Sequence, residues 1–278
     1  MGSETVYVTG LYDVVQYDTS GRILTTFTLP AADNFASGLA VDLVGNLYVG
    51  NGKSGVERIE KFAPDGTYLG VFTDQVHTPI DLQFMANGDL LAVDFWEGAV
   101  VRLSGSGEVI GSFATGLKSP FGLEMDLAGN VLVTSANEES GLAEFRRYRP
   151  DGQLLGVTET AGTGGSNYLA VGQDGDVFVN TRDLVDRFSA AGDRLGEYLS
   201  YGDFSHLGAG IDFDSNGRMY IATIGGPTFR FNADGTYDGV FAETAGWNVL
   251  VHNSVPEPQS LISVAAGALV IFARRRAK

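Results

Sequence analysis

The stretch Gly45-Asn-Leu-Tyr-Val49 places a glycine turn directly before alternating strand residues, and this arrangement returns four times along the chain. The copies are Gly88-Asp-Leu-Leu-Ala92, Gly129-Asn-Val-Leu-Val133, Gly175-Asp-Val-Phe-Val179 and Gly217-Arg-Met-Tyr-Ile221, with spacings of 43, 41, 46 and 42 residues. A second marker, a small or acidic residue followed by glycine, recurs at Gly21, Gly66, Gly107, Gly152, Gly192 and Gly235, with spacings of 45, 41, 45, 40 and 43. Two independent markers with one period indicate repeats of about 43 residues.

Each period holds four strand-sized segments. In the period at residues 38–72 they are 38–42, 46–50, 56–62 and 68–72, and the glycine turns between them are tight. No stretch of these periods has a 3.6-residue periodicity over the length of a helix. Four strands in about 40–45 residues are typical of a β-propeller blade, whereas β-solenoids use shorter repeats.

The two ends of the chain predict how the ring closes. The N-terminus starts inside a repeat, because residues 5–9, 13–17 and 23–27 match a second, third and fourth strand. The missing first strand returns at residues 247–251, after the last whole repeat. We therefore expect an all-β fold, a six-bladed β-propeller over residues 1–254, in which strands from both termini share one blade and leave no free sheet edge.

Charge and composition exclude several classes of partner and site. The chain has 278 residues, with 18 Lys and Arg against 34 Asp and Glu, for a net charge of -16. Such a surface repels phosphate backbones, so no nucleic-acid partner is expected. The absence of cysteine excludes disulfides, thiolate zinc sites and cysteine nucleophiles. A monomer is expected.

Two neighbouring repeats carry a family resemblance. Pro79-Ile-Asp-Leu82, Asn87-Gly-Asp-Leu-Leu-Ala-Val-Asp94 and Val101-Arg-Leu-Ser-Gly-Ser-Gly107 together resemble an NHL-type propeller repeat, and residues 120–133 are the next copy. The resemblance covers nearly the whole domain and implies the architecture. Propellers of this type bind proteins, sugars or RNA, and their relatives include lactonases and lyases, so the fold leaves the function open.

The composition changes abruptly after Ser254. Pro256-Glu257-Pro258 precedes an apolar run at residues 261–273, which Arg274, Arg275 and Arg276 follow. The run is short for a full membrane span, which takes about 17–25 residues. A terminal strand or core helix is the alternative, but it does not explain an apolar run beyond the ring closure that ends in a basic cluster. A short apolar membrane helix with its basic end on the cytoplasmic side explains both features.

This order of segments at residues 255–278 resembles a PEP-CTERM sorting signal. The resemblance implies that Pro256, Glu257 and Pro258 are recognition residues for an exosortase-type processing enzyme, and that residues 261–273 are a transient anchor held by the arginines. It further implies export, an inner-membrane intermediate, and a final place on the cell surface or in the extracellular matrix of a Gram-negative bacterium. Such proteins need an N-terminal signal peptide, and the start Met1-Gly-Ser-Glu-Thr-Val has neither the basic nor the apolar region of one.

Ligands of propellers usually meet the channel mouth formed by the fourth-to-first and second-to-third links. A pair of histidines there could act as a base or as metal ligands. The alternative is that both are exposed loop residues that hydrogen-bond to their neighbours. Asp94 could serve a binding role or a structural turn, and the loop residue Trp96 could stack on a sugar or cover a blade edge. The candidate binding mouth consists of Asn51, His77, Asp94, Trp96, Asn180 and His206.

Signals for catalysis are few, so no catalytic residue, cofactor or metal ligand is assigned, although a divalent cation such as Ca²⁺ stays open. Asp212-Phe-Asp214-Ser-Asn216-Gly217 resembles the start of an EF-hand loop, but Thr223 stands where the bidentate glutamate belongs, which favours a turn. Asp81 and Glu124 are expected on first strands near the axis, where lactonase-like relatives hold a cation. The alternative for both is an outward-facing position.

Three hypotheses follow from these patterns. The first is a noncatalytic surface or matrix propeller that binds a protein or polysaccharide through its mouth. The second is a metal-dependent lactonase- or lyase-like enzyme that uses His77, His206, Glu124 or Asp81. The third is a permanently anchored membrane protein whose tail is never processed.

Overall fold

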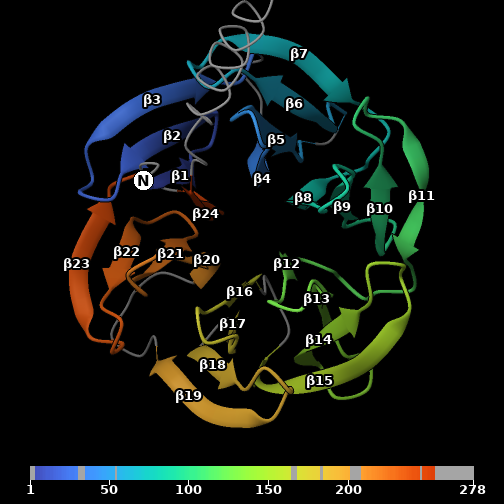
Figure 1. Cartoon of the computed structure of the whole chain (residues 1–278), viewed down its shortest axis with the longest axis vertical. Helices are drawn as coiled ribbons and strands as arrows, with labels where there is room; N and C mark the ends of the chain where they lie inside the picture. Colours follow the sequence, from blue (N-terminus) through green and yellow to red (C-terminus); the bar gives the residue numbers. More distant parts are fainter. Residues whose placement is uncertain are drawn as a thin grey trace, which may run out of the picture.

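A computed structural model describes residues 4–253 except 31–34, 54, 164–167, 182–183, 201–207 and 245 (Figure 1). The described residues form strands β1 to β24 and no helix. They make six four-stranded antiparallel sheets, the blades, which stand around a common axis in Figure 1. The predicted all-β six-bladed propeller is therefore confirmed, while the predicted C-terminal helix lies outside the described residues.

The strands follow the period found in the sequence. Blade 1 contains β24 (Val249–Asn253), β1 (Glu4–Thr9), β2 (Asp13–Asp18) and β3 (Ile23–Thr28). Blade 2 contains β4 (Ala36–Val41), β5 (Leu47–Asn51), β6 (Arg58–Phe62) and β7 (Tyr68–Thr73). Blade 3 contains β8 (Pro79–Phe84), β9 (Leu90–Asp94), β10 (Ala99–Leu103) and β11 (Val109–Ala114).

The second half of the ring repeats this order. Blade 4 contains β12 (Leu123–Met125), β13 (Val131–Ala136), β14 (Leu142–Tyr148) and β15 (Leu154–Thr163). Blade 5 contains β16 (Tyr168–Val171), β17 (Val177–Asn180), β18 (Leu184–Phe188) and β19 (Arg194–Ser200). Blade 6 contains β20 (Gly208–Phe213), β21 (Met219–Thr223), β22 (Thr228–Phe231) and β23 (Tyr237–Ala242).

Blade 1 closes the ring with strands from both ends of the chain, as the sequence predicts. β24 pairs with β1, so that Val249 lies opposite Val8 and Asn253 opposite Glu4. The Thr9 hydroxyl accepts hydrogen bonds from the backbone N–H of Trp247 (2.9 Å) and of Asn248 (2.8 Å). β1 therefore has a hydrogen-bonded strand on both of its edges.

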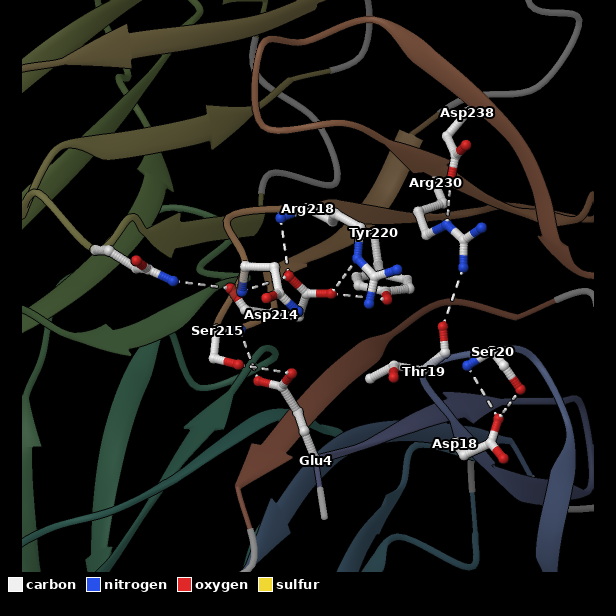
Figure 2. A network of polar contacts seen from close by, with 12 residues as sticks. Glu4, Asp18, Thr19, Ser20, Asp214, Ser215, Arg218, Tyr220, Arg230 and Asp238 are labelled. Carbon is white, nitrogen blue, oxygen red and sulfur yellow. Dashed lines mark hydrogen bonds and ion pairs between the residues drawn. The ribbon is translucent and has the colours of Figure 1, made fainter. Parts of the chain in front are cut away.

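A polar network joins blade 6 to blade 1 beside this closure (Figure 2). Ser215 donates from its backbone N–H (2.7 Å) and its hydroxyl (3.0 Å) to the carboxylate of Glu4. Arg230 donates to the Thr19 carbonyl (3.1 Å) and pairs with Asp238 within its own blade. These contacts fix the N-terminal strand against its neighbour in the ring.

Apolar side chains between the blades form the core. Equivalent aromatic or leucine residues at or next to the ends of the third strands are all buried: Tyr17, Phe62, Leu103, Tyr148, Phe188 and Phe231. Edge-on aromatic pairs cross from blade to blade, with ring centroids 5.8 Å apart for Phe27 and Phe62 and 5.2 Å apart for Phe145 and Phe188. Burial of these faces holds each sheet against the next.

The strand order gives the ring two different faces. The turns that join first to second and third to fourth strands lie at one end, which we call the turn face. The links from second to third strands and from each blade to the next lie at the other end, which we call the loop face. The registers Val41 to Leu47 and Phe84 to Leu90 place the carboxyl ends of the first strands at the turn face.

Candidate functional site

Polar side chains of the first strands meet at the axis of the ring. The strand registers make Leu39, Leu82, Leu123, Leu169, Ile211 and Val249 equivalent positions of the six blades. The residues just before them form one layer: Gly38, Asp81, Gly122, Tyr168, Gly210 and Asn248. The residues just after them form the next layer towards the turn face: Ala40, Gln83, Glu124, Ala170, Asp212 and Leu250.

The first of these layers fills the axis. The Asn248 amide donates to Asp81 Oδ1 (3.1 Å), and the backbone N–H of Leu123 donates to Asp81 Oδ2 (2.9 Å). Asp81 thereby connects blades 1, 3 and 4. A Cβ at Gly38 would lie 2.8 Å from the Asp81 Cα, and one at Gly210 would lie 2.5 Å from the Asn248 oxygen. Only glycine allows such close approach at these two positions.

A cavity of about 300 Å³ lies between this layer and the turn face. Its polar lining residues are Gln83, Glu124, Asp212 and His252. Apolar residues at the ends of the first strands, among them Val41, Phe84 and Met125, complete the wall. The axial cavity is therefore lined from the turn-face ends of the first strands, at the opposite end of the ring from the predicted binding mouth.

The carboxyl groups at the axis have pKa values above their ordinary values. Burial, and then the charges of Asp212 and Asp81, raise the pKa of Glu124 to about 8. Burial raises the pKa of Asp212 to about 7, although the N–H groups of Val251 and Phe213 lower it. Burial also raises the pKa of Asp81 to about 7. Near neutral pH this cluster can both donate and accept protons.

Histidine 252 completes the polar wall of the cavity, and burial lowers the pKa of its imidazole. Among the residues that the structure describes, no three His, Asp or Glu side chains are grouped closely enough to hold a metal ion. Asp212 and Phe213 end β20, and a turn follows them: the Asp214 carboxylate accepts from the N–H groups of Asn216 and Arg218, both at 2.9 Å. The structure thus has a strand-linking turn at this position, which is the alternative to an EF-hand loop.

Three residues of the predicted mouth lie together on the loop face. The backbone N–H of His77 donates to the Asp94 carboxylate (2.9 Å), and the imidazole Nδ1 lies 3.7 Å from the same oxygen. Asp94 also accepts from the N–H of Glu97 (3.2 Å) and is buried. Trp96 is 73% exposed, with its ring edge-on to Phe95. Asp94 thus shapes the loop that displays the indole.

The two asparagines of the predicted mouth are buried and join the links of the loop face. Asn51 accepts from the N–H groups of Phe35 and Lys53, both at 3.2 Å. The Asn180 amide donates to the Ala209 carbonyl of the next blade (2.6 Å). His206 lies outside the described residues, so its pairing with His77 stays a prediction. The sorting-signal residues Pro256, Glu257, Pro258, Arg274, Arg275 and Arg276 also lie outside them.

The sequence predicts part of the axial cluster. It placed Asp81 and Glu124 near the axis, and the structure brings both there. It missed Asn248 and His252 and considered Asp212 only as a calcium ligand. Alignment of the six first strands through their second-strand partners would have put Asp212 and Glu124 at one level of the channel, because equivalent strand positions point the same way.

The tail and the propeller match different known proteins. Residues 254–276 match the PEP-CTERM protein-sorting motif, and this match begins directly after β24. The chain carries a PEP-CTERM sorting motif. A PEP-CTERM motif implies recognition by an exosortase, with export and membrane processing in Gram-negative bacteria. No curated protein matches the chain. No helix among the described residues is long and apolar enough to cross a membrane.

Solved structures match the propeller that precedes the PEP-CTERM motif. A chain from a nidogen–laminin complex has a TM-score of 0.77 at 13% identity, covering 90% of this chain and 99% of that one. A streptogramin B lyase has a TM-score of 0.65 at 17% identity, covering 88% and 83%. A gluconolactonase from Xanthomonas campestris has a TM-score of 0.64 at 16% identity, covering 88% and 87%. At these identities the matches show the fold alone.

Proposed function

We propose that this protein is exported, is sorted and processed through its C-terminal tail by an exosortase, and ends on the cell surface or in the extracellular matrix. There it binds a protein or polysaccharide on its loop face without catalysis. The observation that carries the proposal is the match of residues 254–276 to the sorting motif, immediately beyond a ring that is already closed. A closed propeller followed by a removable tail suits display outside the cell.

The loop-face cluster of His77, Asp94 and Trp96 supports the binding role. A tryptophan that is 73% exposed offers a flat apolar surface to a sugar ring or a protein side chain. Asp94 is buried and fixes the backbone of the loop through two hydrogen bonds, so the loop that carries the indole is ordered before any ligand arrives. A positioned aromatic loses little conformational entropy on binding.

The sorting step is tested in the native host with the protein's own leader. We expect the mature protein to lack the segment after Pro258, by mass, and to be recovered outside the inner membrane. Substitution of Pro256, Glu257 and Pro258 by alanine should keep the full-length chain in the inner membrane. Full-length wild-type protein retained there would contradict sorting and favour a propeller permanently anchored by its tail.

The binding step is tested with the soluble propeller and polysaccharide purified from the same host's matrix. We expect Trp96→Ala to weaken co-sedimentation about tenfold, the size of effect that loss of an aromatic anchor gives. Leu155→Ala, at another exposed apolar position on an outer strand, is the matched control and should bind as the wild type does. Equal loss in both variants, or none in Trp96→Ala, would remove the loop face from the proposal.

A metal-dependent lactonase- or lyase-like enzyme is the second candidate. The axial cavity supports acid–base chemistry, although the described residues include no group of three His, Asp or Glu side chains that could hold the metal. Glu124 and Asp212 line the axial cavity and have pKa values near neutrality, as acid–base groups need. His77 does not line this cavity, so any chemistry there would use the carboxyls with His252. Lactone opening that requires a divalent cation and is lost in Glu124→Gln would favour the enzyme over the binding protein.

A further inference from the structure

The chain leaves the propeller at the turn face. β24 begins beside Thr9 and ends opposite Glu4, and Glu4 binds Ser215 in a first-to-second-strand turn of blade 6. Asn253 is therefore at the turn-face end of the innermost strand of blade 1. His252 lines the axial cavity together with Val41 and Phe84 of blades 2 and 3. The tail thus starts next to the first-strand ends of the following blades.

The tether between the ring and the apolar run is short. Residues 254–260 separate Asn253 from the run at 261–273. Seven residues span at most about 25 Å when fully extended. Because this tether is short and leaves the ring from the turn face, insertion of the apolar run into a bilayer brings the turn face to the lipid and directs the loop face away from it.

The turn face presents apolar side chains at this position. Leu43 and Val44, in the turn that joins β4 to β5, are 92% and 76% exposed. Leu127, in the equivalent turn of blade 4, is 71% exposed. A mainly apolar groove of about 500 Å³ lies between the turns of blades 2 and 3, and it shares Val41 and Phe84 with the axial cavity. Apolar side chains of blades 2 to 4 thus lie near the chain exit, around an axial cavity whose own lining is mainly polar.

An apolar collar surrounds the same face. In every blade, one or both of the first two residues of the fourth strand are apolar and exposed, beside the third-to-fourth turn. These residues are Ile23, Leu24, Tyr68, Leu69, Val109, Ile110, Leu154, Leu155, Leu195 and Tyr237. Scattered exposed leucines are ordinary, but a ring of them at one end of the molecule, with apolar turn tips inside it, is typical of an interaction surface.

The aspartates of the apolar first-to-second-strand turns of blades 2 and 4 lie near basic side chains. The Asp42 carboxylate accepts from Asn46 and lies 4.0 Å from Lys61, and the Asp126 carboxylate lies 3.4 Å from Arg147. In contrast, the corresponding turns of blades 5 and 6 are polar, with Gln173-Asp174 and Ser215-Asn216. The net charge of -16 opposes anionic lipid, so a zwitterionic bilayer fits this surface better.

We propose that the turn face rests on the lipid bilayer while the tail is inserted, with Leu43, Val44 and Leu127 in the interfacial region and the loop face directed outward. The inference rests on the membrane step of the proposed function. It assigns the turn face to the lipid and leaves the loop-face cluster of His77, Asp94 and Trp96 open to a ligand. Because the first-to-second-strand turns of blades 5 and 6 are polar, the ring tilts so that blades 2 to 4 lie nearer the lipid.

The test uses the full chain in phosphatidylcholine vesicles. Because the chain has no cysteine, a single environment-sensitive fluorophore can be placed at Leu43→Cys on the turn face or at Glu97→Cys on the loop face. Both positions are exposed, so neither label should disturb folding. We expect blue-shifted emission and about twofold or more stronger quenching by spin-labelled lipid at position 43 than at 97, as interfacial burial predicts.

The outcomes separate this inference from the sorting proposal. Vesicles that carry the chain but leave position 43 as water-exposed as position 97 overturn the orientation and leave sorting intact. Failure of the chain to float with vesicles overturns both. A blue shift at position 43 without vesicles, lost when the chain ends at residue 254, would show the apolar tail folded onto the groove and would also overturn the bilayer contact.

Discussion

Asp42, Asp126 and Asp214 make the same hydrogen bonds at the same position of three blades. Each carboxylate accepts from the N–H groups two and four residues later, which closes the first-to-second-strand turn. Asp214 is the most buried and also accepts from Arg218 Nε (2.5 Å) and the Tyr220 hydroxyl (3.1 Å) (Figure 2). Burial makes its contacts hard for water to replace.

We expect Asp214→Ala to lower the free energy of unfolding by about 2–4 kcal/mol, because it leaves buried donors without an acceptor. Asp42→Ala removes the same turn contacts at a more exposed site and should cost about half as much. Urea unfolding of both variants against the wild type measures the difference. Equal effects of the two substitutions would show that the turn, and not burial, sets the cost.

At the residue scale the sequence predicts turns better than it predicts the axial site. The repeated spacing marks Asp42, Asp126 and Asp214 as turn residues because their hydrogen bonds are local. The axial cluster depends on six strands that are far apart in the sequence, and Asn248 acquires its contact with Asp81 only through ring closure. A single strand pattern shows that residues alternate but does not show which side faces the axis.

At the scale of elements, β24 decides whether the ring is closed. The sequence predicts this strand because the N-terminal repeat lacks its first strand, although it places the strand at 247–251 and the structure has Val249–Asn253. The difference of two residues arises because the backbone N–H groups of Trp247 and Asn248 bind the Thr9 hydroxyl before the ladder begins. A side-chain contact of this kind leaves no periodic signal.

Truncation on either side of β24 tests its role. A chain ending at residue 254 should keep the cooperative unfolding and Tm of the full chain, because every described strand is retained. A chain ending at residue 246 should aggregate or lose its cooperative transition, since it exposes the edge of β1 and the apolar face that Val249 covers. Thermal scans with light scattering distinguish the two. Similar behaviour of both chains would refute the closure as the stabilising element.

At the scale of the whole molecule, two electrostatic effects act in the same direction. The net charge of -16 is spread over the surface and opposes the compact state. At the axis, the folded-state pKa values of Glu124 and Asp212 are about 8 and about 7, above their ordinary values of 4.5 and 3.8. The folded chain therefore binds more protons than the unfolded chain between about pH 4 and pH 8, so its stability falls as pH rises through that range.

High salt distinguishes surface charge repulsion from the titration of the axial carboxyls, and so tests the origin of the pH dependence. At 1 M NaCl the Debye length is about 3 Å, which screens surface repulsion and leaves the buried carboxyls largely unscreened. We expect Tm at 1 M NaCl still to fall between pH 5.5 and pH 8.5. The double variant Glu124→Gln, Asp212→Asn should reduce this fall by about 2–4 °C for each kcal/mol removed. Glu138→Gln, Glu139→Gln removes two carboxylates at exposed positions and is the charge-matched control. If the axial double variant keeps the wild-type slope, Glu124 and Asp212 do not set the pH dependence, and Asp81 or the surface charge would have to explain it.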